Sequence, residues 1–186
     1  MGRITGTIDL LKKVIRDENC ERMNKSEVKG YLGELIVFQK LRNEGYKPEH
    51  RGNQSDVDII VNDFKIDFKT SELKDDGLES KIWGWALLRK DRVIKYDAAV
   101  CVALDKNLDV NAYYCVSRSN VSDFESHHGH YTNVLNRFHK FPHPPDENSS
   151  NKFKEAFEQS EQLLKEGKVI AIAPDEKLGE IIQKLK

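Results

Sequence analysis

The sequence predicts an α/β fold in which a mixed β-sheet is flanked by helices, and three observations lead to this prediction. Residues 97–104 form a run that is apolar on both faces, which is typical of a central strand. Residues 57–61 and 64–70 are rich in β-branched and aromatic side chains and are predicted to be adjacent antiparallel strands. Stretches with helical periodicity lie before and after these strands, at residues 7–19, 27–43 and 151–165, with Thr7 as a candidate cap of the first helix and Gly45 as the stop of the second. Residues 46–54 are predicted to be a polar connection, and residues 171–174 a lead into a last short helix.

The predicted hairpin at residues 57–70 has one apolar and one charged face. Asn62 and Asp63 lie between its strands and tolerate the tight backbone of a hairpin turn. In the second strand apolar and charged residues alternate: Phe64, Lys65, Ile66, Asp67, Phe68 and Lys69. Because successive side chains of a strand point to opposite faces, Asp67 and Lys69 share a face, about 7 Å apart.

Charged groups therefore gather at one end of this hairpin. Asp58 begins the apolar run of the first strand, so it can project toward the charged face that carries Asp67 and Lys69. A carboxylate from each strand with an ammonium beside them can hold a hard divalent cation and a water nucleophile. Taken alone, the hairpin is explained equally well as an edge strand with a solvated charged face.

The helix predicted at residues 27–43 adds a third acid. This helix is apolar on more than one side, so we expect it to be buried between the sheet and another element. Glu34 is the only acid in the middle of its apolar stretch, and Gly30 and Gly33 before it permit a close approach of the helix. A buried carboxylate is costly unless it is paired, hydrogen-bonded or bound to a metal. These features favour an active-site role for Glu34 over a side chain that reaches solvent or pairs with a nearby lysine.

In combination these motifs resemble the PD-(D/E)XK nuclease superfamily, whose members have the restriction-endonuclease-like fold. The resemblance spans residues 34–71, and the residues that carry it are Gly33, Glu34, Asp58, Asp67, Phe68 and Lys69. Val57 stands where the family usually has proline, so Asp56 competes with Asp58 as the first strand's ligand. We choose Asp58, because family members usually run directly from that aspartate into an apolar strand.

The resemblance implies a Mg²⁺-dependent DNA endonuclease with a defined set of site residues. It implies that Asp58 and Asp67 bind Mg²⁺ directly, that the backbone carbonyl of Phe68 is a third ligand, and that Glu34 acts through a bound water or a second ion. Lys69 would orient the attacking water or stabilise the charge of the transition state. We favour this role over general base, since a lysine ammonium is protonated at neutral pH. The number of metal ions stays open.

Size and charge bear on how the nuclease implied by the resemblance would bind its DNA. The 186 residues suit a single cleavage domain over 1–186, and 30 basic against 31 acidic residues give a net charge of −1. Proteins that grip duplex DNA unaided usually have a basic excess. The chain resembles the small cleavage subunit of heterodimeric type IIS restriction endonucleases, which implies double-stranded DNA as substrate and a larger DNA-recognition subunit as partner. Two alternatives stay open: a stand-alone nuclease of the Holliday-junction-resolvase kind, and a non-catalytic nucleic-acid-associated scaffold.

The cysteines indicate a reducing compartment. Cys20, Cys101 and Cys115 are odd in number and scattered, and two of them lie in strand-like runs. Buried reduced thiols in a cytoplasmic protein are the expected arrangement. No stretch of the sequence is long and apolar enough to span a membrane.

Five of the six histidines lie between His127 and His143, in a segment that also contains Gly129 and three prolines. This composition predicts an irregular surface loop that faces solvent or DNA. A zinc site or a partner-docking surface are the alternatives for this segment, although no cysteine pair accompanies the histidines.

Overall fold

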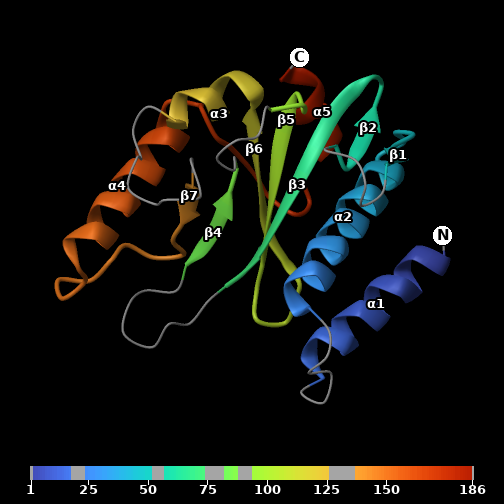
Figure 1. Cartoon of the computed structure of the whole chain (residues 1–186), viewed down its shortest axis with the longest axis horizontal. Coiled ribbons are helices and arrows are strands. Elements are labelled where there is room, and N and C mark those ends of the chain that lie inside the picture. The colour runs from blue at the N-terminus through green and yellow to red at the C-terminus, as the bar shows by residue number, and fades with distance from the viewer. Residues whose placement is uncertain are drawn as a thin grey trace.

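A computed structural model describes residues 2–17, 24–51, 57–73, 82–87, 94–125 and 137–185 (Figure 1). The helices are α1 (Gly2–Arg16), α2 (Lys25–Asn43), α3 (Arg118–Glu125), α4 (Asn151–Lys165) and α5 (Leu178–Lys184). The strands are β1 (Glu49–His50), β2 (Ile59–Val61), β3 (Phe64–Glu72), β4 (Trp83–Ala86), β5 (Ala98–Leu104), β6 (Val110–Ser117), β7 (Arg137–Lys140) and β8 (Ile170–Ile172).

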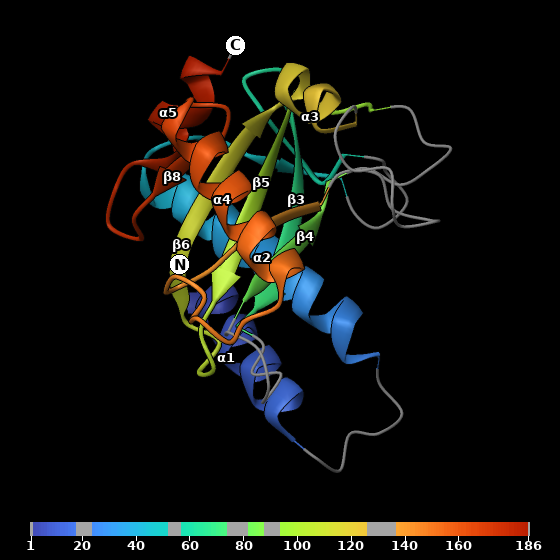
Figure 2. The same ribbon diagram turned by 90° about the vertical axis from the view of Figure 1, so that its left-hand side faces the viewer.

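Six strands form one mixed sheet in the order β1-β2-β3-β5-β6-β8. β3 and β5 are parallel, and the other neighbours are antiparallel. Every residue of β5 is buried, as predicted for the central strand. Helices cover the sheet on both sides: α1 and α2 lie on one side and α4 on the other (Figures 1 and 2). The predicted α/β class, a mixed sheet flanked by helices, is confirmed.

Each face of the sheet has its own hydrophobic core. Under α1, α2 and α5 the buried side chains include Leu32, Val37, Phe68, Val100 and Leu178. On the other face β4 and β7 form a separate two-stranded sheet, and its buried side chains pack on those of β5 and β6. Trp83 and Trp85 lie in this second core, 3% and 2% exposed, so they have the packing role expected for buried aromatic residues.

The two N-terminal helices differ from the prediction at their starts. α1 begins at Gly2, so Thr7 lies inside the helix and does not cap it. α2 begins at Lys25, and the Asn24 side chain caps it by accepting a hydrogen bond from the backbone N–H of Ser26. Gly45, with a φ of 91°, follows the end of α2 as predicted. α2 packs between α1 and β3, which confirms its expected burial between the sheet and another element.

The hairpin forms as predicted, whereas the short strands β1, β7 and β8 were missed. β7 lies in the histidine-rich segment that was predicted to be an irregular loop. Asn62 and Asp63 have φ values of 49° and 65°, the left-handed conformation that a tight hairpin turn requires. β1 lies in a stretch predicted to be a polar connection, and β8 lies where the sequence predicts a lead into the last helix. Both strands are only two or three residues long, so they carry almost no periodic signal.

The remaining predictions concern thiols, histidines and membrane segments. Cys101 and Cys115 are buried free thiols, while Cys20 lies outside the described residues. His139 belongs to β7, and three of the clustered histidines (His127, His128 and His130) lie outside the described residues. None of the described helices is long and apolar enough to cross a membrane.

Candidate active site

The predicted site lies where the pairing between β2 and β3 stops. β2 pairs with β3 only over residues 59–61 and 64–66. Just beyond, the backbone N–H of Asp58 donates to the carbonyl of Ile66, and the N–H of Phe68 donates to Asp58 Oδ2 at 2.6 Å. The Asp58 carboxylate thus accepts the hydrogen bond that a backbone carbonyl would accept if β2 continued. This bond fixes Asp58 at the edge of β3 where the pairing with β2 has ended. Asp56, its competitor in the sequence, lies outside the described residues.

Asp67 and Lys69 lie on the sheet face opposite α2. In the parallel pairing of β3 with β5 they are in register with Ala99 and Cys101, which belong to the core under β4 and β7. Asp67 is only 8% exposed. The Lys69 ammonium lies 2.6 Å from Asp67 Oδ2, and its side chain is 34% exposed. Lys69 therefore reaches from the surface to a buried carboxylate, as the alternation along β3 predicted.

Glu34 approaches the same edge from the other face, and Gly33 makes this possible. A Cβ at Gly33 would lie 1.8 Å from Thr70 Oγ1, so the α2 backbone touches β3 directly there. The next residue, Glu34, is thereby held beside the end of the hairpin. Gly30 has nothing within 4 Å of an added Cβ, so the expectation that it permits the close approach is wrong.

His50 on β1 belongs to this site and was not predicted from the sequence. Its Nε2 atom lies 2.9 Å from Glu34 Oε2. Its ring lies edge-on between two aromatic rings, with centroid separations of 6.2 Å to Tyr31 and 6.4 Å to Phe38. These contacts hold Glu34 in place from the side of β1. A lone histidine in a polar connection is a weak signal, because only the folded chain brings it to the helix.

Burial dominates the electrostatics of Asp67. The pKa of its carboxyl is raised from 3.8 to about 6. Desolvation is the main cause; the charge of Lys69 lowers the pKa, and the charges of Asp58 and Glu34 raise it. Because the Asp67 carboxyl is desolvated and lies near two other acids, it is more stable with a bound proton or cation than as a free anion. The site therefore has the electrostatic character expected of a cation-binding centre.

The other two acids are coupled to the same centre. Burial raises the pKa of Asp58, opposed by the Phe68 amide and then by Lys69. Burial also raises the pKa of Glu34, the bond to His50 lowers it, and the charge of Asp58 raises it again. Glu34 and Asp67 come from opposite sides of the sheet. The charge of Glu34 nevertheless raises the pKa of Asp67, so the two carboxyl groups interact around the open edge of β3.

The oxygen atoms of this edge suit a hard divalent cation. Asp58 and Asp67 supply carboxylates, and the Phe68 carbonyl faces the same edge as its N–H because both groups of a strand residue point to one side. Asp67 Oδ2 is buried and makes no aligned hydrogen bond in the described residues. Among all the described residues, no group of three His, Cys, Asp or Glu side chains is placed so that it could hold a metal ion. The groups that could hold a divalent cation here are thus the carboxylates of Asp58 and Asp67 and the carbonyl of Phe68. The Glu34 carboxylate is instead bonded to His50.

Comparison with known proteins adds a distant structural likeness. No protein-family model matches the sequence, and no curated protein is a detectable relative. Among solved structures, a bacterial homing endonuclease, I-Ssp6803I, is similar with a TM-score of 0.44 and 17% sequence identity. The match covers 78% of this chain and 95% of that one. A likeness this distant leaves the functional assignment to the residues of the site.

Proposed function

We propose that the protein is a Mg²⁺-dependent DNA endonuclease of the PD-(D/E)XK type. The observation that carries this proposal is the gathering of Asp58, Asp67 and Lys69 at the open edge of β3, with Glu34 coupled to them from α2. A buried acid and a partly buried acid beside a partly exposed ammonium can bind a cation and a water next to a phosphodiester. A solvated charged face would not bury Asp67 to 8% exposure.

Each residue of the site has a distinct role in hydrolysis. Asp58, held by the Phe68 amide, and Asp67 would hold Mg²⁺ together with the Phe68 carbonyl. Bound there, Mg²⁺ would stabilise negative charge on the scissile phosphate. Lys69, whose ammonium already lies 2.6 Å from Asp67, would turn toward the phosphate or orient the attacking water. Glu34, oriented by His50, would hold a water at the edge of the site.

A plasmid-nicking assay with and without Mg²⁺ tests this function. We expect Asp67→Asn and Lys69→Ala each to lower the nicking rate by about 10²–10³-fold or more, because each removes a group that acts on the transition-state charge. Chelation of divalent ions should abolish nicking by the wild type. The assay should be run with the chain alone and with the protein encoded by the neighbouring open reading frame.

Matched substitutions on the same hairpin provide the controls. Asp63→Asn changes an exposed acid at the turn, and Lys65→Ala removes an exposed lysine from β3. Both should nick at the wild-type rate. Nicking that survives Asp67→Asn and Lys69→Ala, or that is lost equally in the controls, would rule out the proposed site.

We further propose that a larger subunit supplies sequence recognition, as in heterodimeric type IIS enzymes. The net charge of −1 supports this, because a chain without a basic excess has little general affinity for duplex DNA. A marked rise in nicking rate and a defined cut position on addition of the partner are the expected results. Strong cleavage of branched DNA by the chain alone would favour the resolvase alternative.

A further inference from the structure

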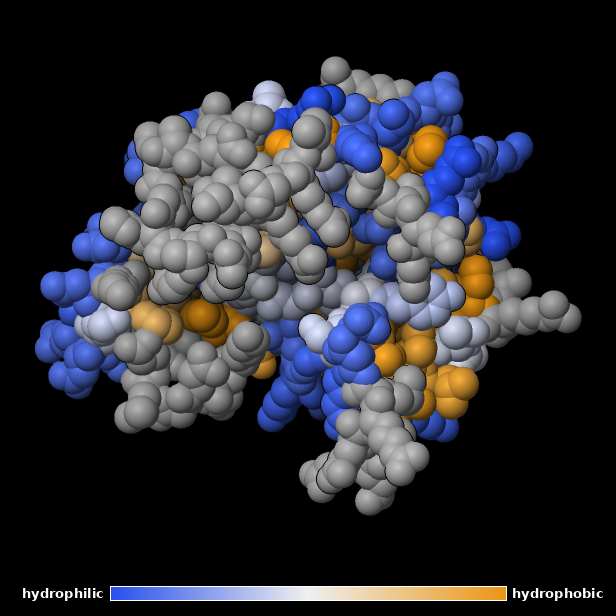
Figure 3. Space-filling view, in the orientation of Figure 1, coloured by the Kyte–Doolittle hydropathy of each residue, from blue (hydrophilic) through white to orange (hydrophobic). Residues whose placement is uncertain are grey.

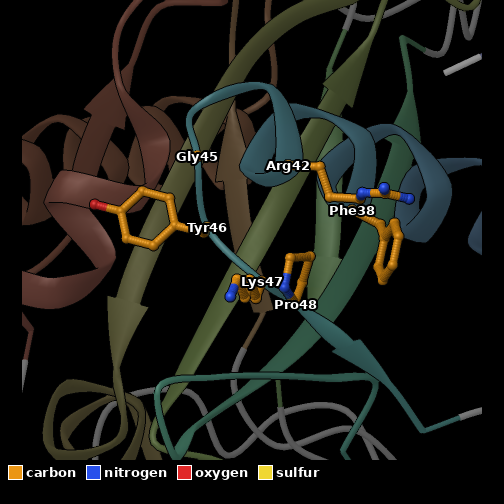
Figure 4. A pocket seen from close by; sticks show the side chains of 6 residues that line it. All are labelled: Phe38, Arg42, Gly45, Tyr46, Lys47 and Pro48. Atoms are coloured by element: carbon orange, nitrogen blue, oxygen red, sulfur yellow. The ribbon is translucent and has the colours of Figure 1, made fainter.

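A pocket next to the candidate site is not explained by the catalytic residues. It has a volume of about 440 Å³ and is lined by Phe38, Arg42, Gly45, Tyr46, Lys47 and Pro48. These residues come from the end of α2 and the segment that leads into β1, so we call it the α2–β1 pocket. Figure 4 shows Phe38 and Arg42 projecting together from α2, while Tyr46 points the opposite way and Lys47 and Pro48 lie on the connecting segment.

The charged residues that line the α2–β1 pocket are all basic. Arg42 and Lys47 are its charged lining residues, and none of the lining residues is acidic. The Arg42 guanidinium lies over the Phe38 ring, 6.0 Å from its centroid. In the described part of the chain neither cation forms an ion pair, unlike Lys29 and Lys40 of α2 and Lys69 of β3. Two cations without acidic partners in a chain of net charge −1 favour an anionic ligand.

The pocket is joined to the candidate site by direct contacts. Phe38, on which Arg42 stacks, lies edge-on to the His50 ring. His50 in turn bonds Glu34. Lys47 precedes His50 by three residues, so their backbones are at most about 10 Å apart. The pocket therefore lies close to Glu34 and to the charged edge of β3.

We propose that Arg42 and Lys47 bind backbone phosphates of the DNA strand that is cut, close to the scissile phosphate. This inference rests on the proposed endonuclease function and adds the path of the substrate strand. The planar guanidinium of Arg42, already oriented by Phe38, presents paired donors suited to phosphate oxygens. The α2–β1 pocket then sets the direction from which the strand enters the site.

An apolar partner surface is a weaker explanation for the pocket. Across the described residues only Leu10 and Tyr31 are large hydrophobic side chains that are clearly exposed. The face seen in Figure 3 likewise has its hydrophobic residues in several separate areas, with hydrophilic residues between them. Recognition through charge therefore fits this region better than a hydrophobic docking contact.

DNA binding by the full chain in a Lys69→Ala background tests the inference without rapid cleavage. We expect Arg42→Ala/Lys47→Ala to bind a short duplex about tenfold more weakly and to lower the salt dependence by about two phosphate contacts. The matched control is Lys106→Ala/Lys165→Ala, which removes two exposed charges from the β5–β6 turn and from the end of α4. The control should bind like the parent. Equal affinity and salt dependence in both double variants would overturn the inference.

A chemical footprint on the wild-type chain gives an independent readout. We expect bound DNA to protect Lys47 from acetylation several-fold and to leave Lys106 reactive. Unchanged Lys47 reactivity with DNA bound, or protection by poly-glutamate but not by DNA, would overturn the proposed phosphate site. If nicking still depends on Asp67 in that case, the endonuclease function stands and the pocket assignment alone is wrong. Absence of both DNA binding and nicking in the wild type, with and without the partner, would overturn both.

Discussion

The buried carboxyl of Asp67 makes the stability of the metal-free protein depend on pH. Its pKa is raised from 3.8 to about 6, mainly by burial. The folded state therefore keeps a proton over a pH range in which the unfolded chain has released it. The contribution of Asp67 to the free energy of unfolding is fully present below about pH 4, falls as the pH rises to about 6, and is lost above that.

We expect Asp67→Asn to raise the free energy of unfolding by about 1–3 kcal/mol near pH 7, because it removes the desolvated charge. The gain should shrink toward pH ~4, where Asp67 is protonated in both states. Urea unfolding in the presence of a chelator, repeated across this pH range, measures the effect. Asp63→Asn, at the exposed turn, should show no such dependence. A gain of the same size at both ends of the range would contradict the raised pKa.

His50 is a positioning residue for Glu34, and its removal should cost activity more than stability. We expect His50→Ala to slow nicking by about 10–100-fold, as is usual for residues that orient a metal-site carboxylate. His50→Gln should recover part of the rate, since its amide can donate to Glu34. Nicking rates and thermal unfolding of both variants are the measurements.

An exposed histidine elsewhere provides the control for His50. His143→Ala should nick at the wild-type rate, because His143 lies on the surface between β7 and α4. Equal loss of stability in His50→Ala and His50→Gln, with no recovery of nicking by glutamine, would reduce His50 to a packing role.

At the scale of elements, the contact between α2 and β3 decides where Glu34 lies. We expect Gly33→Ala to destabilise the fold by about 1–3 kcal/mol and to reduce nicking, because the added methyl meets Thr70 Oγ1 and pushes the helix away from the strand. Gly30→Ala on the same helix should instead stabilise by up to about 1 kcal/mol, since its Cβ enters open space. Denaturant unfolding and nicking rates of the two variants distinguish these outcomes.

A double substitution tests the cause of the Gly33 effect. Thr70 Oγ1 is buried and has no hydrogen-bond partner in the described residues, so Thr70→Ala should cost little by itself. Combined with Gly33→Ala, it should recover part of the lost stability and activity, giving a non-additive cycle. Strict additivity would show that the two positions do not compete for space.

Much of the fold was predictable because its signals are local. The Asn62–Asp63 turn, the stop at Gly45 and the fully apolar β5 each follow from a few neighbouring residues. The start of α1 was placed too late, because Thr7 looked like a cap although the helix begins at Gly2. β8 was missed, because a three-residue strand is specified by its pairing with β6 and not by its own pattern.

The candidate site was predictable only in part, for the same reason. Asp58, Asp67 and Lys69 are linked by strand alternation and a short turn, which the sequence displays. The coupling of Glu34 to them depends on the close approach at Gly33, which the sequence only suggested. His50 reaches Glu34 through tertiary structure, and the α2–β1 pocket arises from side chains that have no shared motif.

For the molecule as a whole, charge and the number of sites set the expected course of cleavage. With a net charge of −1, general attraction to DNA is weak, and the two cations that line the α2–β1 pocket are too few to change this balance. One candidate site per chain can hydrolyse one strand at a time. Association with a partner would then supply both affinity and the second cut.

We expect supercoiled plasmid to accumulate as open circles before any linear product forms, because each encounter with one site cuts one strand. Addition of the recognition subunit should raise the rate and convert the product to linear DNA. A time course on agarose gels at several protein concentrations measures both steps. Linear product that forms by the chain alone without a nicked intermediate, and more steeply with concentration, would indicate a symmetric dimer with two sites. That outcome would leave the residues at the edge of β3 in their roles and replace the heterodimer by two copies of this chain.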